Sequence, residues 1–263
     1  MARVELILLN CDKETCIMNN YIFDGSFEGL LTAIYEAYYR HEEPRSIITD
    51  ENPQLNLFET NYTVFTDNRK AKKVYTAIKE KISYKALKDI YYVYLCDAEE
   101  NRGLLIHNYL KLGWKYGSKL EQYMCDDYVF KVQNICKRVT FECHRLLGLI
   151  RFKRLEDDLY YAQIEPDNNI VGLLAPHFSK RLADQNWVIH DVKRNIAAIF
   201  NRSEWALTSI DKPINFMPKD MEELYQDLWK QYFKNISIKS RINPKLQKRC
   251  MPARYWNHLI EKE

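Results

Sequence analysis

Residues 186–201 read "NWVIHDVKRNIAAIFN", two apolar runs separated by a short basic stretch. The runs at 186–191 and 195–201 are rich in β-branched and aromatic residues, which favour strands over helices. Lys193 and Arg194 stand between the runs and indicate a turn. We therefore expect two antiparallel strands joined by a basic turn, with 204–210 as a candidate third strand.

The sequence before this hairpin predicts a second one. Residues 149–155, "LIRFKRL", alternate between apolar and basic side chains, and 159–165, "LYYAQIE", follow an acidic turn. Between the two hairpins, residues 168–182 have apolar side chains at helical spacing, and Pro176 is expected to break or restart that helix. We expect residues 148–210 to form one antiparallel sheet, with the segment 168–182 packed on its apolar face.

Helices are predicted on both sides of this block. Residues 125–147 carry an apolar stripe at 3–4 spacing, and 21–40 read as strand, turn and helix. The other expected elements are short extended pieces in a loop at 41–66, a basic helix at 68–88, tyrosine-rich helices within 86–117 and a helix near 218–234.

The expected fold class is α+β, with a helical N-terminal half, an antiparallel β-hairpin–helix–β-hairpin block and a basic helical C-terminal segment. We place the boundaries at 1–124, 125–211 and 212–263, with one compact unit as the alternative.

Charge is distributed unevenly along the 263 residues, although the formal net charge is only +3. Residues 1–67 hold four Lys or Arg against twelve Asp or Glu, whereas the rest of the chain holds 35 against 24. An acidic N-terminal region followed by a basic remainder suggests a polyanionic partner. The alternative is that the two regions attract each other.

The seven cysteines include no C-x-x-C pair and are odd in number, which indicates reduced thiols in a cytoplasm. Cys143 and His144, with Cys136 seven residues before Cys143, make a poor metal box. We therefore expect no metal and no cofactor. No apolar run approaches the roughly 20 residues of a membrane span, so we expect a soluble cytoplasmic protein without a membrane partner.

The C-terminal segment is basic and free of acids, with eight Lys or Arg and no Asp or Glu between Asp227 and Glu261. Lys and Arg spread along a groove bind phosphates, and aromatic rings stack on unpaired bases. We expect Tyr255 and Trp256 to anchor this segment in the core and its cations to bind DNA; a merely solvated basic face is the alternative. The candidate nucleic-acid-binding residues are Arg138, Arg145, Arg151, Lys193, Arg194, Arg241, Lys245, Lys248, Arg249 and Arg254.

The candidates for catalysis are weak, and they are His190, Asp191 and Glu142. The two neighbours on the 186–191 strand face opposite ways, and Asp191 is placed to cap the basic turn. Glu142 can pair with Arg145 on the same helix, and His177 on an apolar helix face is expected to be a core histidine. The chain contains no G-x-S-x-G or H-E-x-x-H motif. A non-catalytic role is therefore favoured over an enzyme.

Four stretches in collinear order carry a resemblance to a known family: "FDGSFEGLLTAIYEAY" (23–38), "ECHRLLGLIRF" (142–152), "IEPDNNIVGLLAPHFSKRLADQNWVIHDVKR" (164–194) and "INPKLQKRCMPARYWNHL" (242–259). The chain resembles an uncharacterised bacterial family of DNA metabolism or repair proteins. Members of that family are associated with a radical-SAM DNA repair protein, and a similar domain occurs fused behind uracil-DNA glycosylase-like domains.

The resemblance implies action on DNA beside a repair enzyme. The chain lacks the C-x-x-x-C-x-x-C cluster site of a radical-SAM enzyme, so that enzyme would be its partner. We expect a DNA-binding accessory protein in DNA repair or modification. The alternatives are a repair enzyme that cleaves bases or backbone, and a protein-interaction scaffold without DNA contact.

Overall fold

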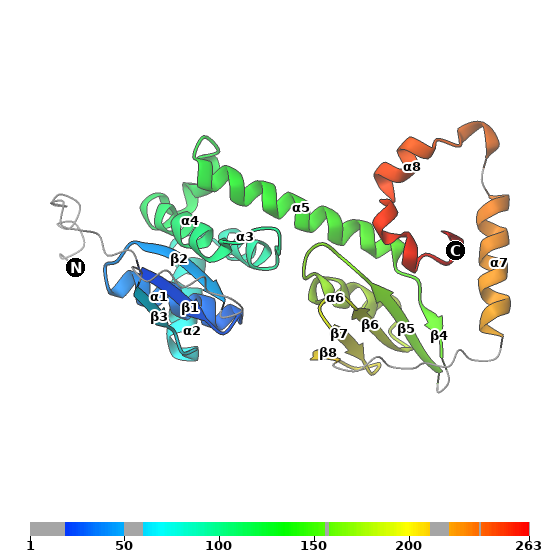
Figure 1. Cartoon of the computed structure of the whole chain (residues 1–263), viewed down its shortest axis with the longest axis horizontal. Helices are drawn as coiled ribbons and strands as arrows, with labels where there is room; N and C mark the ends of the chain where they lie inside the picture. Colours follow the sequence, from blue (N-terminus) through cyan, green and yellow to red (C-terminus); the bar gives the residue numbers. More distant parts are fainter. Residues whose placement is uncertain (1–18, 50–59, 156–157, 211–220, 237, 263) are drawn as a thin grey trace. The chain divides into compact units, whose positions relative to one another are not determined.

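The computed structural model describes residues 19–49, 60–155, 158–210, 221–236 and 238–262 (Figure 1). The chain divides into two units, residues 1–94 with 99–134 and residues 95–98 with 135–263. Helices and sheets are mixed in both, so the α+β class is confirmed. The division falls inside the long helix α5, Asp127–Leu149. This helix confirms the one expected at 125–147.

The first unit contains a parallel three-stranded sheet in the order β2-β1-β3. Its central strand, β1, is buried along its whole length. The chain reverses at Gly25, where φ is +82°, and the Ser26 side chain caps the next helix by accepting from the backbone N–H of Gly29. The strand, turn and helix expected at 21–40 are thus confirmed. The elements are β1 Asn19–Phe23, α1 Phe27–Tyr39, β2 Pro44–Thr49, β3 Thr60–Thr63, α2 Asn68–Lys81, α3 Tyr84–Tyr94, α4 Arg102–Tyr116 and a 3-10 helix, Gly117–Gln122.

The basic helix expected at 68–88 is two helices. Helix α2 ends at Lys81, and α3 begins at Tyr84. The hydroxyl of Ser83 accepts from the backbone N–H of Ala86, 2.9 Å away, and so caps the start of α3. The continuous apolar pattern in residues 68–88 predicted one helix, and the cap at Ser83 that starts the second helix was not recognised from it.

Helix α4 packs closely on β2 because Gly103 lets the backbones approach. A Cβ at position 103 would lie 2.4 Å from the carbonyl oxygen of Ile47 and 2.7 Å from its Cβ. Ile47 itself is 1% exposed, so it has no free space to move into. The contact holds the helical layer of the first unit on its sheet.

The second unit contains a five-stranded sheet in the order β4-β5-β6-β7-β8. Its core gathers aromatic rings around Trp187, which is fully buried and stacks on Phe200 with ring centroids 5.3 Å apart. Phe178 of the crossing helix packs edge-on against Phe152 and contributes to the same core. The elements are β4 Lys153–Arg154, β5 Leu159–Ile164, α6 Val171–Arg181, β6 Asn186–Asp191, β7 Ile196–Phe200, β8 Trp205–Ser209, α7 Glu222–Asn235, η3 Lys239–Arg241, α8 Pro244–Cys250, η4 Ala253–His258 and η5 Ile260–Lys262.

The prediction of a purely antiparallel sheet was wrong at one pair. The pairs β4–β5, β6–β7 and β7–β8 are antiparallel, as expected for hairpins, but β5 and β6 are parallel. The chain leaves the end of β5, crosses over through α6 and starts β6 beside the beginning of β5. Such a strand–helix–strand crossover returns the second strand in the same direction.

The prediction that Pro176 breaks its helix was also wrong, since α6 runs from Val171 to Arg181 with the proline inside it. Proline removes one backbone donor and crowds the carbonyl four residues earlier. Pro176 lies on the exposed side, while Leu174 and Phe178 are buried before and after it. Packing on both sides of the proline keeps the helix in one piece.

A pair of Gly→Ala substitutions tests the close approach of α4. Alanine favours a helix over glycine by up to about 1 kcal/mol, so Gly148→Ala in α5, with open space around its Cβ, should raise the free energy of unfolding. Gly103→Ala should instead lower it by about 1–3 kcal/mol, the usual cost of overpacking. Urea unfolding of both variants measures the difference. A Gly103→Ala protein as stable as the wild type would contradict the packing.

Candidate nucleic-acid interface

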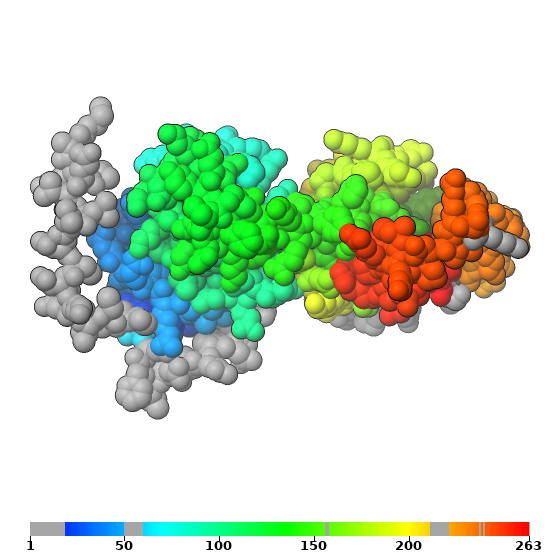
Figure 2. Space-filling model, turned by 90° about the horizontal axis from the view of Figure 1, so that it is seen from above, coloured from blue at the N-terminus to red at the C-terminus, as the bar shows by residue number. Residues whose placement is uncertain are grey.

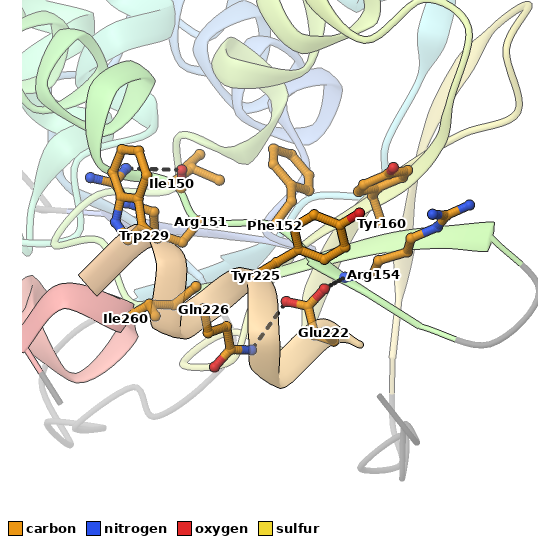
Figure 3. Close-up of a pocket in the computed structure, with 10 residues that line it drawn as sticks. All are labelled: Ile150, Arg151, Phe152, Arg154, Tyr160, Glu222, Tyr225, Gln226, Trp229 and Ile260. Carbon is orange, nitrogen blue, oxygen red and sulfur yellow. Dashed lines mark hydrogen bonds between the residues drawn. The ribbon is translucent and has the colours of Figure 1, made fainter. Parts of the chain in front are cut away.

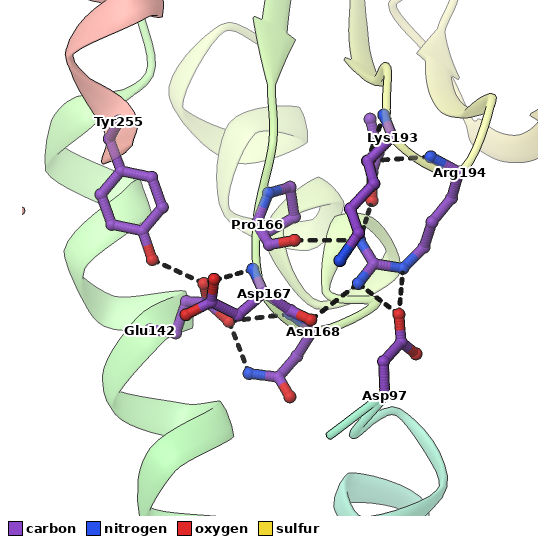
Figure 4. Close-up of polar contacts among 9 residues, drawn as sticks. Asp97, Glu142, Pro166, Asp167, Asn168, Lys193, Arg194 and Tyr255 are labelled. Carbon is purple, nitrogen blue, oxygen red and sulfur yellow. Dashed lines mark hydrogen bonds and ion pairs between the residues drawn. The ribbon is translucent and has the colours of Figure 1, made fainter. Parts of the chain in front are cut away.

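Glu142 of α5 joins three segments of the second unit (Figure 4). Its side chain is 4% exposed and accepts four hydrogen bonds. Two come from the backbone N–H groups of Asp167 and Asn168, at 2.7 and 3.1 Å, and one from the Asn168 side-chain amide at 2.6 Å. The fourth comes from the hydroxyl of Tyr255 at 2.5 Å. The expected ion pair with Arg145 was wrong, because the carboxylate points into this buried site.

Tyr255 lies in η4 and is 2% exposed, which confirms that it anchors the C-terminal segment in the core. Burial and the hydrogen bond to the Glu142 carboxylate raise the pKa of Tyr255, so the hydroxyl remains a donor at neutral pH. Arg254 lies over the Tyr255 ring, 4.8 Å from its centroid, and forms an ion pair with Asp167 at 2.8 Å. Trp256 is half-buried and donates to the carbonyl of Met251.

Arg194 is the centre of a second polar cluster in the same unit. Its guanidinium contacts Asp191 at 2.5 Å and Asp97 at 2.6 Å, and it also donates to the carbonyl oxygens of Pro166 and Asp167. Asp191 is fully buried and accepts from the backbone N–H groups of residues 193 and 194. The turn cap expected of Asp191 is confirmed. Two carboxylates neutralise the Arg194 charge.

His190 and His177 differ in their exposure. His190 is 6% exposed, and its Nδ1 lies 2.7 Å from the hydroxyl of Tyr161. Burial lowers the pKa of His190, so it is held neutral. His177, which was expected to be a core histidine, is exposed on α6; the helix turns its apolar face to the sheet at Leu174 and Phe178 instead. The three candidate catalytic residues, His190, Asp191 and Glu142, are all buried. Glu142 and Asp191 lie in two separate polar clusters, and His190 contacts Tyr161.

The ten candidate nucleic-acid-binding residues fall into three groups. Arg151 forms a bidentate ion pair with Glu261, and Arg194 and Arg254 are paired as described above. Arg145 is half-buried, and the remaining six are exposed. Within the described residues, none of these six forms an ion pair: Arg138, Lys193, Arg241, Lys245, Lys248 and Arg249.

A basic C-terminal surface forms where α8 meets α5. The Arg145 guanidinium donates to the backbone carbonyl of Arg249 at 3.0 Å. Helix α8 begins at Pro244, where Asn243 caps it by accepting from the N–H of Leu246. Figure 2 shows the orange α8 beside the green end of α5. We define the basic C-terminal surface by the exposed cations of these two helices, Lys137, Arg138, Lys245, Lys248 and Arg249, together with Arg145. Arg241 lies in η3, which precedes α8.

Sequence reasoning missed Lys137 and Phe141 on α5. Together with Arg138, Thr140 and His144 they line a surface hollow of about 520 Å³. The signal was present in the sequence, because Phe141 is an aromatic residue outside the apolar stripe that runs along the rest of the helix.

A second hollow, of about 580 Å³, lies between α7 and the edge of the sheet formed by β4 and β5 (Figure 3). Phe152, Tyr160 and Tyr225 line one part of it, and Trp229 and Arg151 line another. Trp229 donates to Glu261, the carboxylate that also holds Arg151. The hollow is thus bounded by residues that attach α7 to the rest of its unit.

Neither a metal centre nor a membrane helix is found in the described ranges. No three His, Cys, Asp or Glu side chains gather there in a way that could hold a metal ion. Among the same residues, no helix combines the length and the apolarity that crossing a bilayer requires.

These features define an α+β protein whose second unit carries a basic helical C-terminal surface. Residues 100–261 match the model of a family described as a domain of unknown function, DUF4130, and the chain belongs to this family. No curated protein matches the chain. The matched residues include the whole sheet of the second unit and begin after the sheet of the first.

Removing the Tyr255 hydroxyl tests the role of Glu142. Tyr255→Phe should lower the free energy of unfolding by about 1.5–3 kcal/mol, the range for a hydrogen bond to a charged group. Tyr232→Phe, at an exposed position on α7, is the matched control and should leave stability unchanged. Chemical denaturation measures both. Equal stability of the two variants would mean that the Glu142 contact does not hold the C-terminal segment.

Proposed function

We propose that this protein binds DNA as an accessory protein in DNA repair or modification, acting with a radical-SAM partner enzyme. The observation that carries the DNA part is the hydrogen bond from Arg145 to the Arg249 carbonyl. It joins a basic helix face to a basic terminal helix, so that cations far apart in sequence form one surface. Phosphate groups bind such a surface through charge and release counterions on binding.

The distribution of paired and unpaired cations supports this proposal. Arginines that stabilise the fold form ion pairs with carboxylates: Arg151 pairs with Glu261, and Arg194 pairs with Asp191. The sequence of the basic C-terminal surface offers no acid between Asp227 and Glu261 to balance Lys245, Lys248 and Arg249. A polyanion would supply the missing countercharge.

The partner part rests on the family resemblance and on α7. Leu224, Leu228 and Tyr232 follow one another at four-residue spacing along this helix, and each is about half exposed. A monomeric protein rarely leaves such a contiguous apolar stripe in water. A protein that covers the stripe would bury it, and the radical-SAM enzyme is the partner that we propose.

Catalysis by this chain itself is less well supported. Glu142 has four hydrogen-bond donors around it, and Asp191 is fully buried against Arg194. A general acid or base must reach its substrate directly or through one water. Buried groups that are already saturated with internal partners do not meet this condition.

Charge removal from α8 tests DNA binding. The triple variant Lys245→Ala, Lys248→Ala, Arg249→Ala should bind all DNA sequences more weakly, since phosphate contacts carry no sequence information. The slope of log affinity against log salt should flatten by up to about three units, and by fewer for single strands. Fluorescence anisotropy over a salt series measures both quantities.

The matched control removes three exposed lysines from α2, through Lys72→Ala, Lys79→Ala and Lys81→Ala. It changes net charge by the same amount but leaves the basic C-terminal surface intact. It should keep the wild-type salt slope. Equal weakening by both triple variants, or wild-type binding by the α8 variant, would contradict the assignment of DNA binding to this surface.

A single substitution on α7 tests the protein partner. Leu228→Ser should reduce co-purification with the radical-SAM enzyme while leaving DNA affinity unchanged, because a hydroxyl in an apolar interface lacks a hydrogen-bond partner. Leu207→Ser on β8 is the control, since Leu207 is exposed to the same extent as Leu228, 50% against 51%. If both variants retain the enzyme equally, the stripe on α7 is not its docking site.

A further inference from the structure

Phe141 is an exposed aromatic residue on a helix whose other apolar residues largely face the core. Its ring is 55% exposed, whereas Val139 and Leu146 of the same helix are buried. An isolated exposed aromatic side chain is common. Phe141 differs because it borders the 520 Å³ hollow and stands among cations.

The hollow around Phe141 combines a flat apolar surface with positive charge. Lys137 and Arg138 lie at its edge with Thr140 and His144, and no carboxylate lines it. A ligand that fits must therefore offer both negative charge and a flat, apolar group.

Arg145 sets the position of the ring. Its guanidinium lies 4.1 Å from the centroid of Phe141, a cation–π contact. The same guanidinium donates to the Arg249 carbonyl, so it is attached to α8 as well. One face of the ring is thereby supported by a residue that is itself held, and a supported ring loses little freedom when a second planar group stacks on it.

We propose that Phe141 stacks on an unpaired base of a single DNA strand, while Lys137 and Arg138 contact the flanking phosphates. This inference rests on the proposed function and names its substrate form. In an intact duplex the faces of the bases are covered by the neighbouring bases, so the ring would have no base to stack on. In a single strand every base offers a face for stacking, whatever the sequence.

The experiment compares binding of the full chain to an oligothymidylate and to a duplex of equal length by fluorescence anisotropy. Phe141→Ala should weaken binding to the single strand by roughly tenfold, the size of one lost base–aromatic stack. It should leave duplex binding unchanged. Phe141→Trp should restore single-strand affinity, because a larger ring stacks at least as well.

Phe130→Ala provides the matched control on the same helix, since Phe130 is 52% exposed. It should bind both DNA forms as the wild type does. A strand carrying 2-aminopurine adds a direct readout: stacking should quench its fluorescence on the wild type and on Phe141→Trp but not on Phe141→Ala. Thermal unfolding shows whether each variant is folded: Phe130→Ala should match the wild type, and Phe141→Ala should be only slightly less stable, because it loses the cation–π contact with Arg145.

The outcomes separate this inference from the proposed function. If Phe141→Ala binds single strands like the wild type, while the α8 triple variant loses affinity, the stacking inference is wrong and DNA binding stands. If Phe141→Ala loses single-strand and duplex affinity alike, the ring only shapes the surface and the inference is again wrong. If the wild type binds neither DNA form, or binds polyglutamate equally well, the proposed function itself fails.

Discussion

The carboxylate of Glu142 is buried, and a buried charge is tolerated only where donors surround it. Its four hydrogen bonds come from the loop between β5 and α6 and from Tyr255 near the C-terminus. One turn further along α5, Arg145 reaches the backbone of α8. The position of the terminal cations therefore follows from a buried acid, because the anchor that fixes η4 also keeps α8 beside the basic face of α5.

The basic side chains of this unit have two different roles. Arg194 and Arg151 are held by carboxylates and neutralise internal charge. The cations of α8 have solvent around them instead. Formal net charge cannot express this difference, because it counts a paired arginine and an exposed lysine equally. The positive charge that a partner can reach therefore depends on which basic side chains the fold pairs with acidic ones.

Local pattern predicted much of the fold. Alternation in residues 149–155 and the apolar runs at 186–191 and 195–201 predicted strands of the second sheet, and the apolar residues at 3–4 spacing predicted α5, because burial leaves a pattern in the sequence. The parallel pairing of β5 and β6 leaves no such trace, since direction depends on how the chain crosses over. The site was less predictable still. Tyr255 and Glu142 are 113 residues apart, and the nearby Arg145 appeared to be the natural partner of Glu142.

The second unit is discontinuous in sequence, since residues 95–98 belong to it together with 135–263. Asp97 pairs with Arg194, and the carbonyl of Leu95 accepts from the N–H of Asn169. On the ribosome, residues 95–98 emerge well before the segments that they contact, and Tyr255 emerges after the other hydrogen-bond donors of Glu142. Domains generally fold as units during synthesis. The second unit must therefore wait until synthesis has passed residue 255, and a ribosome stalled before that point would leave Glu142 without one of its donors.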